Sequence, residues 1–90
     1  MNFEWDATKA AANVRKHGVA FDEAASALKD EFAATAHDLE HSVTEFRYLT
    51  FGVSAYRRLL AVSHTERGDS IRIISARLAT RTERKIYEEG

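Results

Sequence analysis

The sequence contains no cysteine and no proline, and only four of its 90 residues are glycine. Without cysteine the chain can form neither a disulfide framework nor a thiolate metal site. Its apolar runs are far shorter than the roughly 20 residues of a membrane-spanning helix, and the opening MNFEWD does not resemble a signal peptide. Neither a glycine-rich phosphate loop nor a serine nucleophile elbow occurs. We therefore expect a soluble cytoplasmic protein that needs no cofactor and does not contact a membrane.

The length of the chain limits it to one domain. Ninety residues, 1–90, leave no room for a second core, and the sequence has no repeat and no low-complexity linker. A domain this small buries only part of its surface and is marginally stable alone. Binding to a partner, or dimerisation, is therefore expected.

The formal net charge of −1 conceals a difference between the two halves of the chain. Residues 1–45 hold four Lys/Arg and nine Asp/Glu. Residues 46–90 hold nine Lys/Arg and five Asp/Glu. Eight of these nine cations are arginines, which suit bidentate contacts with phosphate. Such asymmetry can indicate a surface that faces nucleic acid. Arginines that merely keep an exposed sheet in solution explain it equally well, since the isoelectric point is not basic.

The first part of the chain predicts a short strand and two helices. Phe3 and Trp5 alternate with polar residues, as in a strand. Asp6 is a favourable N-cap for the helix that follows, and Gly18 is a favourable residue to end it. The residues expected on the buried helix faces are Ala7, Ala11 and Val14 in the first helix, and Phe21, Ala25 and Leu28 in the second.

From Phe32 onward the apolar residues recur with a period of two, which predicts strands. The expected strands are 32–36, 45–53, 59–64 and 71–76, with a charged loop HDLEHS after the first and a turn TERGD before the last. Thr80, with Glu83 three residues later, predicts a capped terminal helix that reaches Glu89. The expected fold is α+β: a short N-terminal strand, two helices, an antiparallel sheet of about four strands and a C-terminal helix. One sheet face packs on helices, and the other is left concave and polar.

Arginines on the predicted strands are the first candidates for a functional site. Arg47, Arg72 and Arg77 lie within or at the end of strands, where a guanidinium is held in position to stabilise charge on a phosphate. Arg72 lies between Ile71 and Ile73 and should point away from them. Because side chains alternate along a strand, Arg77 should share the face of Ile71 and Ile73. At the end of the strand we expect it to turn out to solvent. Each of these arginines can equally be a surface residue at the edge of the sheet, with its charged end reaching into solvent.

Histidines are the second group of candidates. Cleavage of RNA without a metal needs a base for the 2′-hydroxyl proton, an acid for the leaving oxygen, and cations on the phosphate. Histidine suits both proton transfers because it titrates near neutral pH. His17 follows a helix and His64 ends a strand, while Glu45 and Tyr87 are further acid–base candidates. His17 is equally well explained as a cation that stabilises the C-terminal end of the helix.

The segment around His37 and His41 has the spacing of a zinc-binding pair. Its neighbours Asp38 and Glu40 add carboxylates, but the segment lacks a helical period and no third ligand is evident. We therefore expect a solvated connection between strands and not a metal site.

Three separated strings resemble the BrnT family. They are FEWDATKAAANVRKHGVAFDEA, the E-x-R…G element of Glu45, Arg47 and Gly52, and VSHTERGDSIRIISARLATRTERKIYEE. The resemblance extends from Asn2 to about Glu89. It implies a RelE-like fold and a ribonuclease toxin that blocks translation. It also implies a co-expressed antitoxin of the BrnA type that neutralises the toxin. The antitoxin binds DNA, and the toxin is associated with DNA only through the antitoxin.

The position of residues in these motifs implies a set of functional candidates. The matching residues are Lys16, His17, Glu45, Arg47, His64, Arg77 and Tyr87. Taken with the chemistry above, Arg47 and Arg77 are expected to hold the scissile phosphate, and His17 is the leading general acid or base with Glu45 as its partner. The residues expected to help bind RNA are Lys16, His64, Arg72 and Tyr87.

Two alternatives involve no RNA cleavage. The cationic half of the chain would equally serve a toxin that occupies the ribosome without cutting RNA, because contacts with phosphate need no catalysis. A toxin that acts on a protein target is the other alternative, since a fold alone does not settle function. RNA ends that carry a 2′,3′-cyclic phosphate would exclude both.

Overall fold

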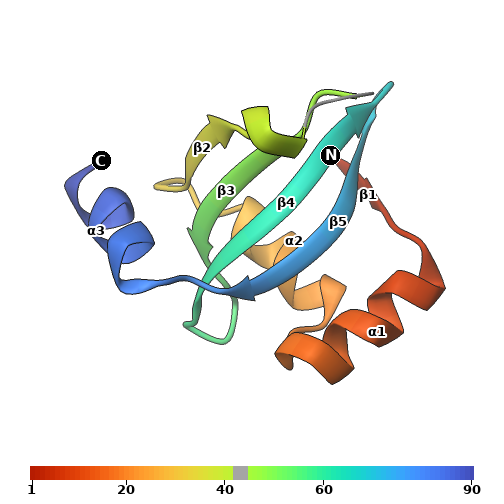
Figure 1. Ribbon diagram of the computed structural model, residues 1–90, viewed down its shortest axis with the longest axis horizontal. Helices are drawn as coiled ribbons and strands as arrows, with labels where there is room; N and C mark the ends of the chain where they lie inside the picture. Colours follow the sequence, from red (N-terminus) through yellow and green to blue (C-terminus); the bar gives the residue numbers. More distant parts are fainter. Residues whose placement is uncertain (42–44) are drawn as a thin grey trace.

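The described residues, 1–41 and 45–90 of a computed structural model, form a five-stranded mixed sheet with three α-helices (Figure 1). The α+β class predicted from the sequence is confirmed. The strands are β1 (Asn2–Glu4), β2 (Ala34–His37), β3 (Tyr48–Val53), β4 (Leu59–Arg67) and β5 (Ser70–Leu78). The helices are α1 (Ala7–His17), α2 (Phe21–Leu28), the 3-10 helix η1 (Leu39–His41) and α3 (Arg81–Glu89).

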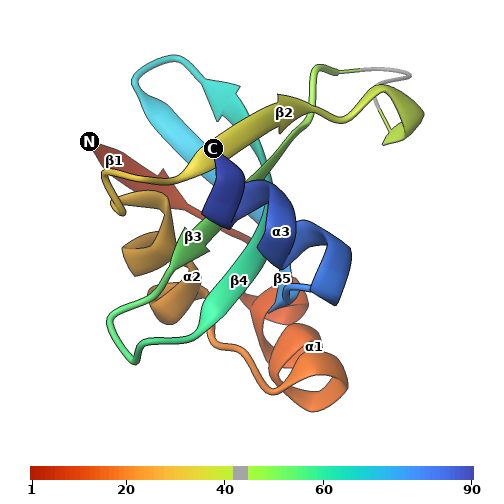
Figure 2. The same ribbon diagram turned by 90° about the vertical axis from the view of Figure 1, so that its left-hand side faces the viewer.

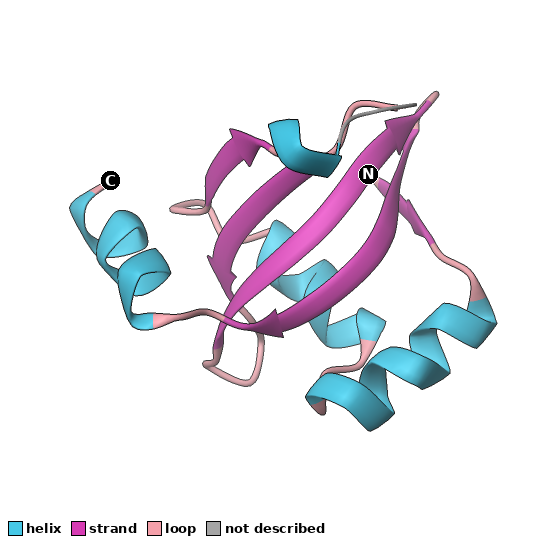
Figure 3. Cartoon of the chain, viewed as in Figure 1, coloured by secondary structure: helices cyan, strands magenta, loops and turns pink. Residues whose placement is uncertain are grey.

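The sheet contains the predicted antiparallel strands and one parallel addition. Strands β2 to β5 pair with their neighbours in chain order, and the sheet order is β1-β5-β4-β3-β2. The N-terminal strand joins this sheet because β1 runs parallel to β5, with Phe3 opposite Ile71. Figure 3 shows the strands as one curved layer. None of the described helices is long and apolar enough to cross a membrane.

Helix α2 covers one face of the sheet, which we call the helix face (Figures 1 and 2). Gly52 of β3 permits the close approach, because a Cβ atom there would collide with the carbonyl oxygen of Ala27 in α2. The core residues between helix and sheet are Val19, Phe21, Ala24, Ala25, Ala27, Leu60, Val62, Ile73 and Ala76. On the opposite face, which we call the open face, the described residues form no such layer, and η1 lies above one part of it (Figure 1).

The expected ends of α1 are confirmed, but its expected buried face is wrong. The Asp6 side chain accepts a hydrogen bond from the backbone of Lys9, and Gly18 adopts the left-handed conformation with φ 69°. Val14 is 48% exposed, and Ala7 and Ala11 are exposed as well. The buried residue of this helix is Asn13.

Asn13 is buried because α1 lies beside a strand edge that needs polar partners. Strand β1 pairs only with residues 70–72, so no described strand lies beside the later part of β5 on that side. The Asn13 amide nitrogen donates to the carbonyl oxygens of Val19 at 2.9 Å and Ala76 at 2.8 Å, and its oxygen accepts from the Ala76 nitrogen at 3.2 Å. A buried backbone edge requires these bonds, which an apolar helix face cannot supply.

A β-bulge in β5 reverses the expected orientation of Arg77. Ser63 pairs with Ser75 while His64 pairs with Ile73, so Ile74 is an extra residue on β5. Beyond the bulge, Ala76 faces the core and Arg77 faces the opposite side. The prediction that Arg77 shares the face of the isoleucines was therefore wrong.

The segments on either side of β2 also differ from the prediction. The backbone nitrogen of Phe32 donates to the Asp30 side chain at 3.0 Å, which forms a turn, and β2 begins only at Ala34. Phe32 is 72% exposed. Part of the expected loop HDLEHS forms η1, while its last residue, Ser42, lies outside the described residues.

Polar contacts hold the terminal helix. The predicted capping box of α3 is confirmed, with Thr80 and Glu83 bonded to each other's backbone nitrogen. The Tyr87 hydroxyl donates to Asp30 at 2.6 Å, and the same carboxylate oxygen accepts from the Val53 nitrogen at 2.8 Å. Helix α3 contains no buried residue. Its position beside β3 therefore depends on a few polar contacts.

Candidate functional site

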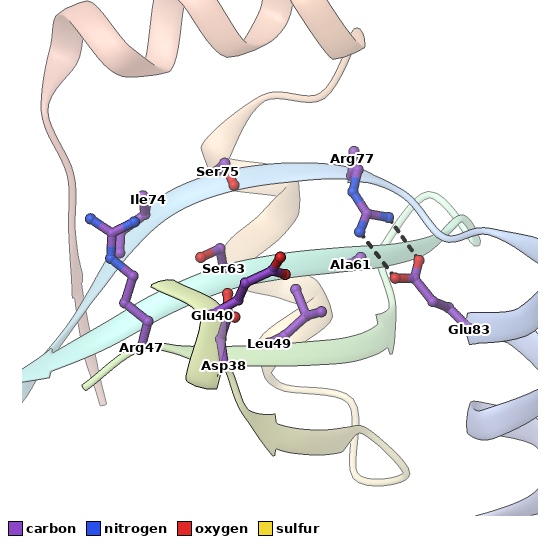
Figure 4. A pocket seen from close by; sticks show the side chains of 10 residues that line it. All are labelled: Asp38, Glu40, Arg47, Leu49, Ala61, Ser63, Ile74, Ser75, Arg77 and Glu83. Carbon is purple, nitrogen blue, oxygen red and sulfur yellow. Dashed lines mark hydrogen bonds and ion pairs between the residues drawn. The ribbon is translucent and has the colours of Figure 1, made fainter. Parts of the chain in front are cut away.

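A cavity of about 410 Å³ lies on the open face of the sheet (Figure 4). Strands β3, β4 and β5 form its floor, and residues of the η1 segment and of α3 form its walls. The lining residues are Asp38, Glu40, Arg47, Leu49, Ala61, Ser63, Ile74, Ser75, Arg77 and Glu83. The concave and polar face that the sequence predicts is thus present.

Small residues create the depth of the cavity. Ser63 and Ser75 are paired across β4 and β5, and Ala61 is paired with Arg77. Their short side chains leave room above the strands for a ligand, and the two hydroxyls can donate hydrogen bonds to oxygen atoms placed there. The bulge at Ile74 is required for this floor, because it turns Ser75 and Arg77 to the open face, away from the core side of Ile73.

Two arginines stand at opposite ends of the cavity (Figure 4). Arg47 precedes β3, and its Nε lies 3.5 Å from a carboxylate oxygen of Glu45. Arg77 comes from β5. Their side chains are 30% and 39% exposed, so both remain accessible to a ligand. The structure therefore brings together two of the arginines that the sequence singles out.

Arg77 is engaged by a carboxylate of α3. Its two terminal nitrogens lie 2.7 and 3.0 Å from the oxygens of Glu83. This hydrogen bonding raises the pKa of Arg77 and lowers the pKa of Glu83. Glu83 also accepts from the backbone nitrogen of Thr80 at 2.9 Å. An anionic ligand that reaches Arg77 therefore competes with a carboxylate that is itself fixed by the helix cap.

Asp38 and Glu40 line the cavity. The sequence predicted only a solvated connection between strands for this segment. Asp38 precedes η1 and Glu40 belongs to it. The backbone nitrogen of Asp38 donates to the carbonyl oxygen of Arg47 at 2.7 Å, which ties this segment to the start of β3. In Figure 4 the Glu40 side chain extends over β4, with its carboxylate between the two arginines. The spacing of charges in HDLEHS gives no sign of this position.

Glu45 and Arg72 lie outside the lining of the cavity. Glu45 contacts Arg47 and is 4.0 Å from Arg67. Arg72 is on β5 before the bulge, paired with Thr65 on β4 and with Glu4 on β1. Glu45 can thus act on the cavity through Arg47, whereas Arg72 is a separate cationic position.

His64 is buried on the helix face. Its Nε2 is hydrogen-bonded to the Thr50 hydroxyl at 2.7 Å, and its ring stacks on Tyr48 with centroids 5.7 Å apart. Its Nδ1 has no hydrogen-bond partner among the described residues. Burial lowers the pKa of His64, so the ring is neutral over a wider pH range. The ring is therefore not presented to the cavity.

The remaining candidates, Tyr87, Lys16 and His17, lie outside the lining of the cavity. The hydrogen bond to Asp30 raises the pKa of Tyr87 to about 12 and commits its hydroxyl to the packing of α3. Lys16 is exposed and His17 is half-buried at the end of α1. His17 follows Asn13 by four residues, on the same helix face, and Asn13 bonds to Ala76, the neighbour of Arg77. His17 thus lies along the edge of β5, outside the lining residues.

The segment around His37 is packed against aromatic residues. The His37 ring lies 5.1 Å from the ring of Phe46 and 5.7 Å from that of Tyr48, measured between centroids. Over residues 1–41 and 45–90, no group of three or more histidine, aspartate or glutamate side chains is arranged to hold a metal ion.

Comparison with known proteins identifies one family. The family described as "Ribonuclease toxin, BrnT, of type II toxin-antitoxin system" matches residues 5–83. No curated protein sequence shows a significant match. Among solved structures, the crystal structure of the Brucella abortus ribonuclease toxin BrnT is similar, with a TM-score of 0.69 and 24% identity. The similarity covers 90% of this chain and 99% of that one, and at this identity it shows the fold.

Proposed function

The chain belongs to the BrnT family, the ribonuclease toxins of type II toxin–antitoxin systems, and from this premise we propose that it cuts RNA at the cavity between Arg47 and Arg77 without a metal ion. Its partner is a cognate antitoxin. The observation that carries the proposed site is the pair of arginines at the two ends of a floor of small residues. Guanidinium groups suit phosphate because they offer paired donors and a permanent charge.

The proposed reaction is attack of the RNA 2′-hydroxyl on the adjacent phosphorus. Arg47 and Arg77 hold the phosphate and stabilise the charge that develops on its oxygens. His17 transfers a proton from the end of α1, which approaches the Arg77 end of β5 through the Asn13 contacts with Ala76. Glu45 acts by orienting Arg47. The products are a 2′,3′-cyclic phosphate and a free 5′-hydroxyl.

The other candidate residues take different parts in this proposal. Lys16 and Arg72 are cationic positions outside the cavity, suited to phosphates on either side of the cleavage point. His64 and Tyr87 support the fold through Thr50 and Asp30, and we assign them no direct contact with RNA. This division follows from which side chains are free to meet a ligand.

The wider setting extends the same proposal. The antitoxin is of the BrnA type, so the chain is linked to DNA only through its partner. The RNA substrate is cut free or on the ribosome, in the cytoplasm, and two copies of the chain are joined in the complex with the antitoxin. The small size of the domain supports such an assembly.

The experiment that tests the proposed function uses purified chain and end-labelled RNA in EDTA. Wild type should cut the RNA and leave 2′,3′-cyclic phosphate ends, while Arg77→Ala should be slower by about 100-fold or more. Arg84→Ala is the matched control, because Arg84 is an exposed arginine of α3 outside the cavity. RNA that stays intact should be tested again with translating ribosomes. Intact RNA there as well would contradict cleavage and favour a toxin that only blocks its target.

A further inference from the structure

The cavity contains a carboxylate that the proposed function does not yet use. Glu40 projects from η1 over β4, and its carboxylate lies between Arg47 and Arg77 (Figure 4). The charged groups that line the cavity around it are Asp38 on its own segment, Arg47 before β3, Arg77 on β5 and Glu83 on α3. A ligand phosphate held by both arginines would thus be placed beside Glu40.

Attack by a 2′-hydroxyl requires a proton acceptor within hydrogen-bond reach of that hydroxyl. None of the described lining residues is a histidine, lysine or tyrosine, so the carboxylates are the candidates inside the cavity. Glu83 is already bonded to Arg77 and to the Thr80 nitrogen. Glu40 is the carboxylate whose side chain extends over the floor between the arginines.

We propose that Glu40 accepts the proton of the attacking 2′-hydroxyl, a role that rests on the proposed function of the cavity. The attacking and leaving oxygens of a phosphoryl transfer lie roughly in line on opposite sides of phosphorus. Glu40 approaches from the η1 side of the cavity, while α1, with His17 at its end, lies along the edge of β5. Because α1 lies along the edge of β5, a proton from His17 would reach the phosphate from a different side than Glu40 does, as an in-line reaction requires.

The proposed step is balanced in atoms and charge. The 2′-hydroxyl proton moves to Glu40, the 2′-oxygen forms a bond to phosphorus, and the bond from phosphorus to the 5′-oxygen breaks. The leaving 5′-oxygen takes a proton from the imidazolium of His17. Exchange of protons with water then returns Glu40 to the carboxylate and His17 to its cationic form. No metal or co-reactant other than water takes part in this step.

The test compares Glu40→Gln with Glu31→Gln, whose glutamate is exposed and lies outside the cavity. Glutamine keeps the shape of the side chain but cannot accept the proton. Glu40→Gln should lower kcat by about 100-fold or more without raising KM, and Glu31→Gln should match wild type. The fall in kcat on acidification, which follows protonation of the base, should also be lost in Glu40→Gln. Binding of uncleavable 2′-O-methyl RNA should be no weaker than in wild type, because the substitution only removes a negative charge beside the phosphate site.

Each other result overturns a different claim. If wild type cuts RNA and Glu40→Gln has the same kcat and pH profile, the role of Glu40 is wrong and the proposed function still holds. Loss of activity in Asp38→Asn, with activity kept in Glu40→Gln, would assign the base to Asp38 instead. Wild type that leaves RNA intact, with and without ribosomes, would overturn the proposed function and this role together. Equal melting temperatures of the variants would show that the differences do not arise from unfolding.

Discussion

Arg77 and Glu83 face each other across the boundary between β5 and α3, with two nitrogen–oxygen contacts of 2.7 and 3.0 Å. Because Glu83 also caps α3 through the Thr80 nitrogen, one carboxylate both begins the helix and neutralises a cavity arginine. The availability of Arg77 to a phosphate is therefore coupled to the first turn of the terminal helix.

Substitution Glu83→Gln should tighten the binding of RNA. Glutamine can still accept from the Thr80 nitrogen, but it removes the negative charge that competes with phosphate for Arg77. The dissociation constant for 2′-O-methyl RNA should fall by up to about fivefold, the equivalent of a partly exposed ion pair of up to about 1 kcal/mol. Fluorescence anisotropy would measure it, with Glu88→Gln as the control on the same helix. Unchanged or weaker binding would show that Glu83 does not compete for the arginine.

Substitution Asn13→Ala should destabilise the fold by about 3 kcal/mol. It leaves the backbone groups of Ala76 and the carbonyl of Val19 without their buried partners, and each loss costs about 1 kcal/mol or more. Urea unfolding would measure the change, with the exposed Asn2→Ala as control. An equal effect of the two substitutions would contradict the assigned role of Asn13.

Local signals explain which parts of the fold were predictable. Asp6, Gly18, Thr80 and Glu83 act within one turn of their own helix, so the sequence alone predicts the helix ends. The burial of Asn13 depends on a strand edge about 60 residues later in the chain that has no neighbouring strand among the described residues, a feature that apolar periodicity cannot report.

Substitution Gly52→Ala should destabilise the packing of α2 on the sheet. The added methyl group would overlap the Ala27 carbonyl oxygen, and backbone on both sides leaves little freedom to move apart. Overpacking of this kind costs about 1–3 kcal/mol. Gly68→Ala is the comparison, because its site is open and only its φ of 58° opposes a side chain, at a cost of about 1 kcal/mol. Thermal melts should rank Gly52→Ala as the less stable variant.

His64 should make the fold less stable in mild acid. The unfolded imidazole gains a proton near its ordinary pKa of 6.5, whereas burial lowers the pKa of the folded group. At a pH above 6.5, protonation of His64 therefore does not reduce the free energy of unfolding. As the pH falls below 6.5, the free energy of unfolding decreases by up to about 1.4 kcal/mol per pH unit. The carboxylates of Glu23 and Glu83, with pKa values lowered from 4.5, lose their contributions only in stronger acid.

Urea unfolding between about pH 7.5 and pH 5.5 measures this dependence. His64→Gln should unfold with a smaller change over that interval, because its side chain has no proton to gain. A decline as steep as that of wild type would assign the acid sensitivity to other groups.

The candidate site was only partly predictable because it depends on pairing between strands. Arg47 and Arg77 were singled out by residue type, but the face of Arg77 depends on the extra residue Ile74, which is visible only in the register with β4. Glu40 looked like one more charge in a polar loop, and its place above β4 is a product of tertiary structure.

The parallel pairing of β1 with β5 also has a consequence for how the protein is made. Residues 2–4 find their partners at residues 70–72, so β1 cannot pair until about 65 further residues have left the ribosome. The same late strand carries Arg77 and most of one side of the cavity floor. A nascent chain therefore lacks the complete cavity floor until residues 70–78 have been made, and the two ends of the sheet come together only after all the strands between them.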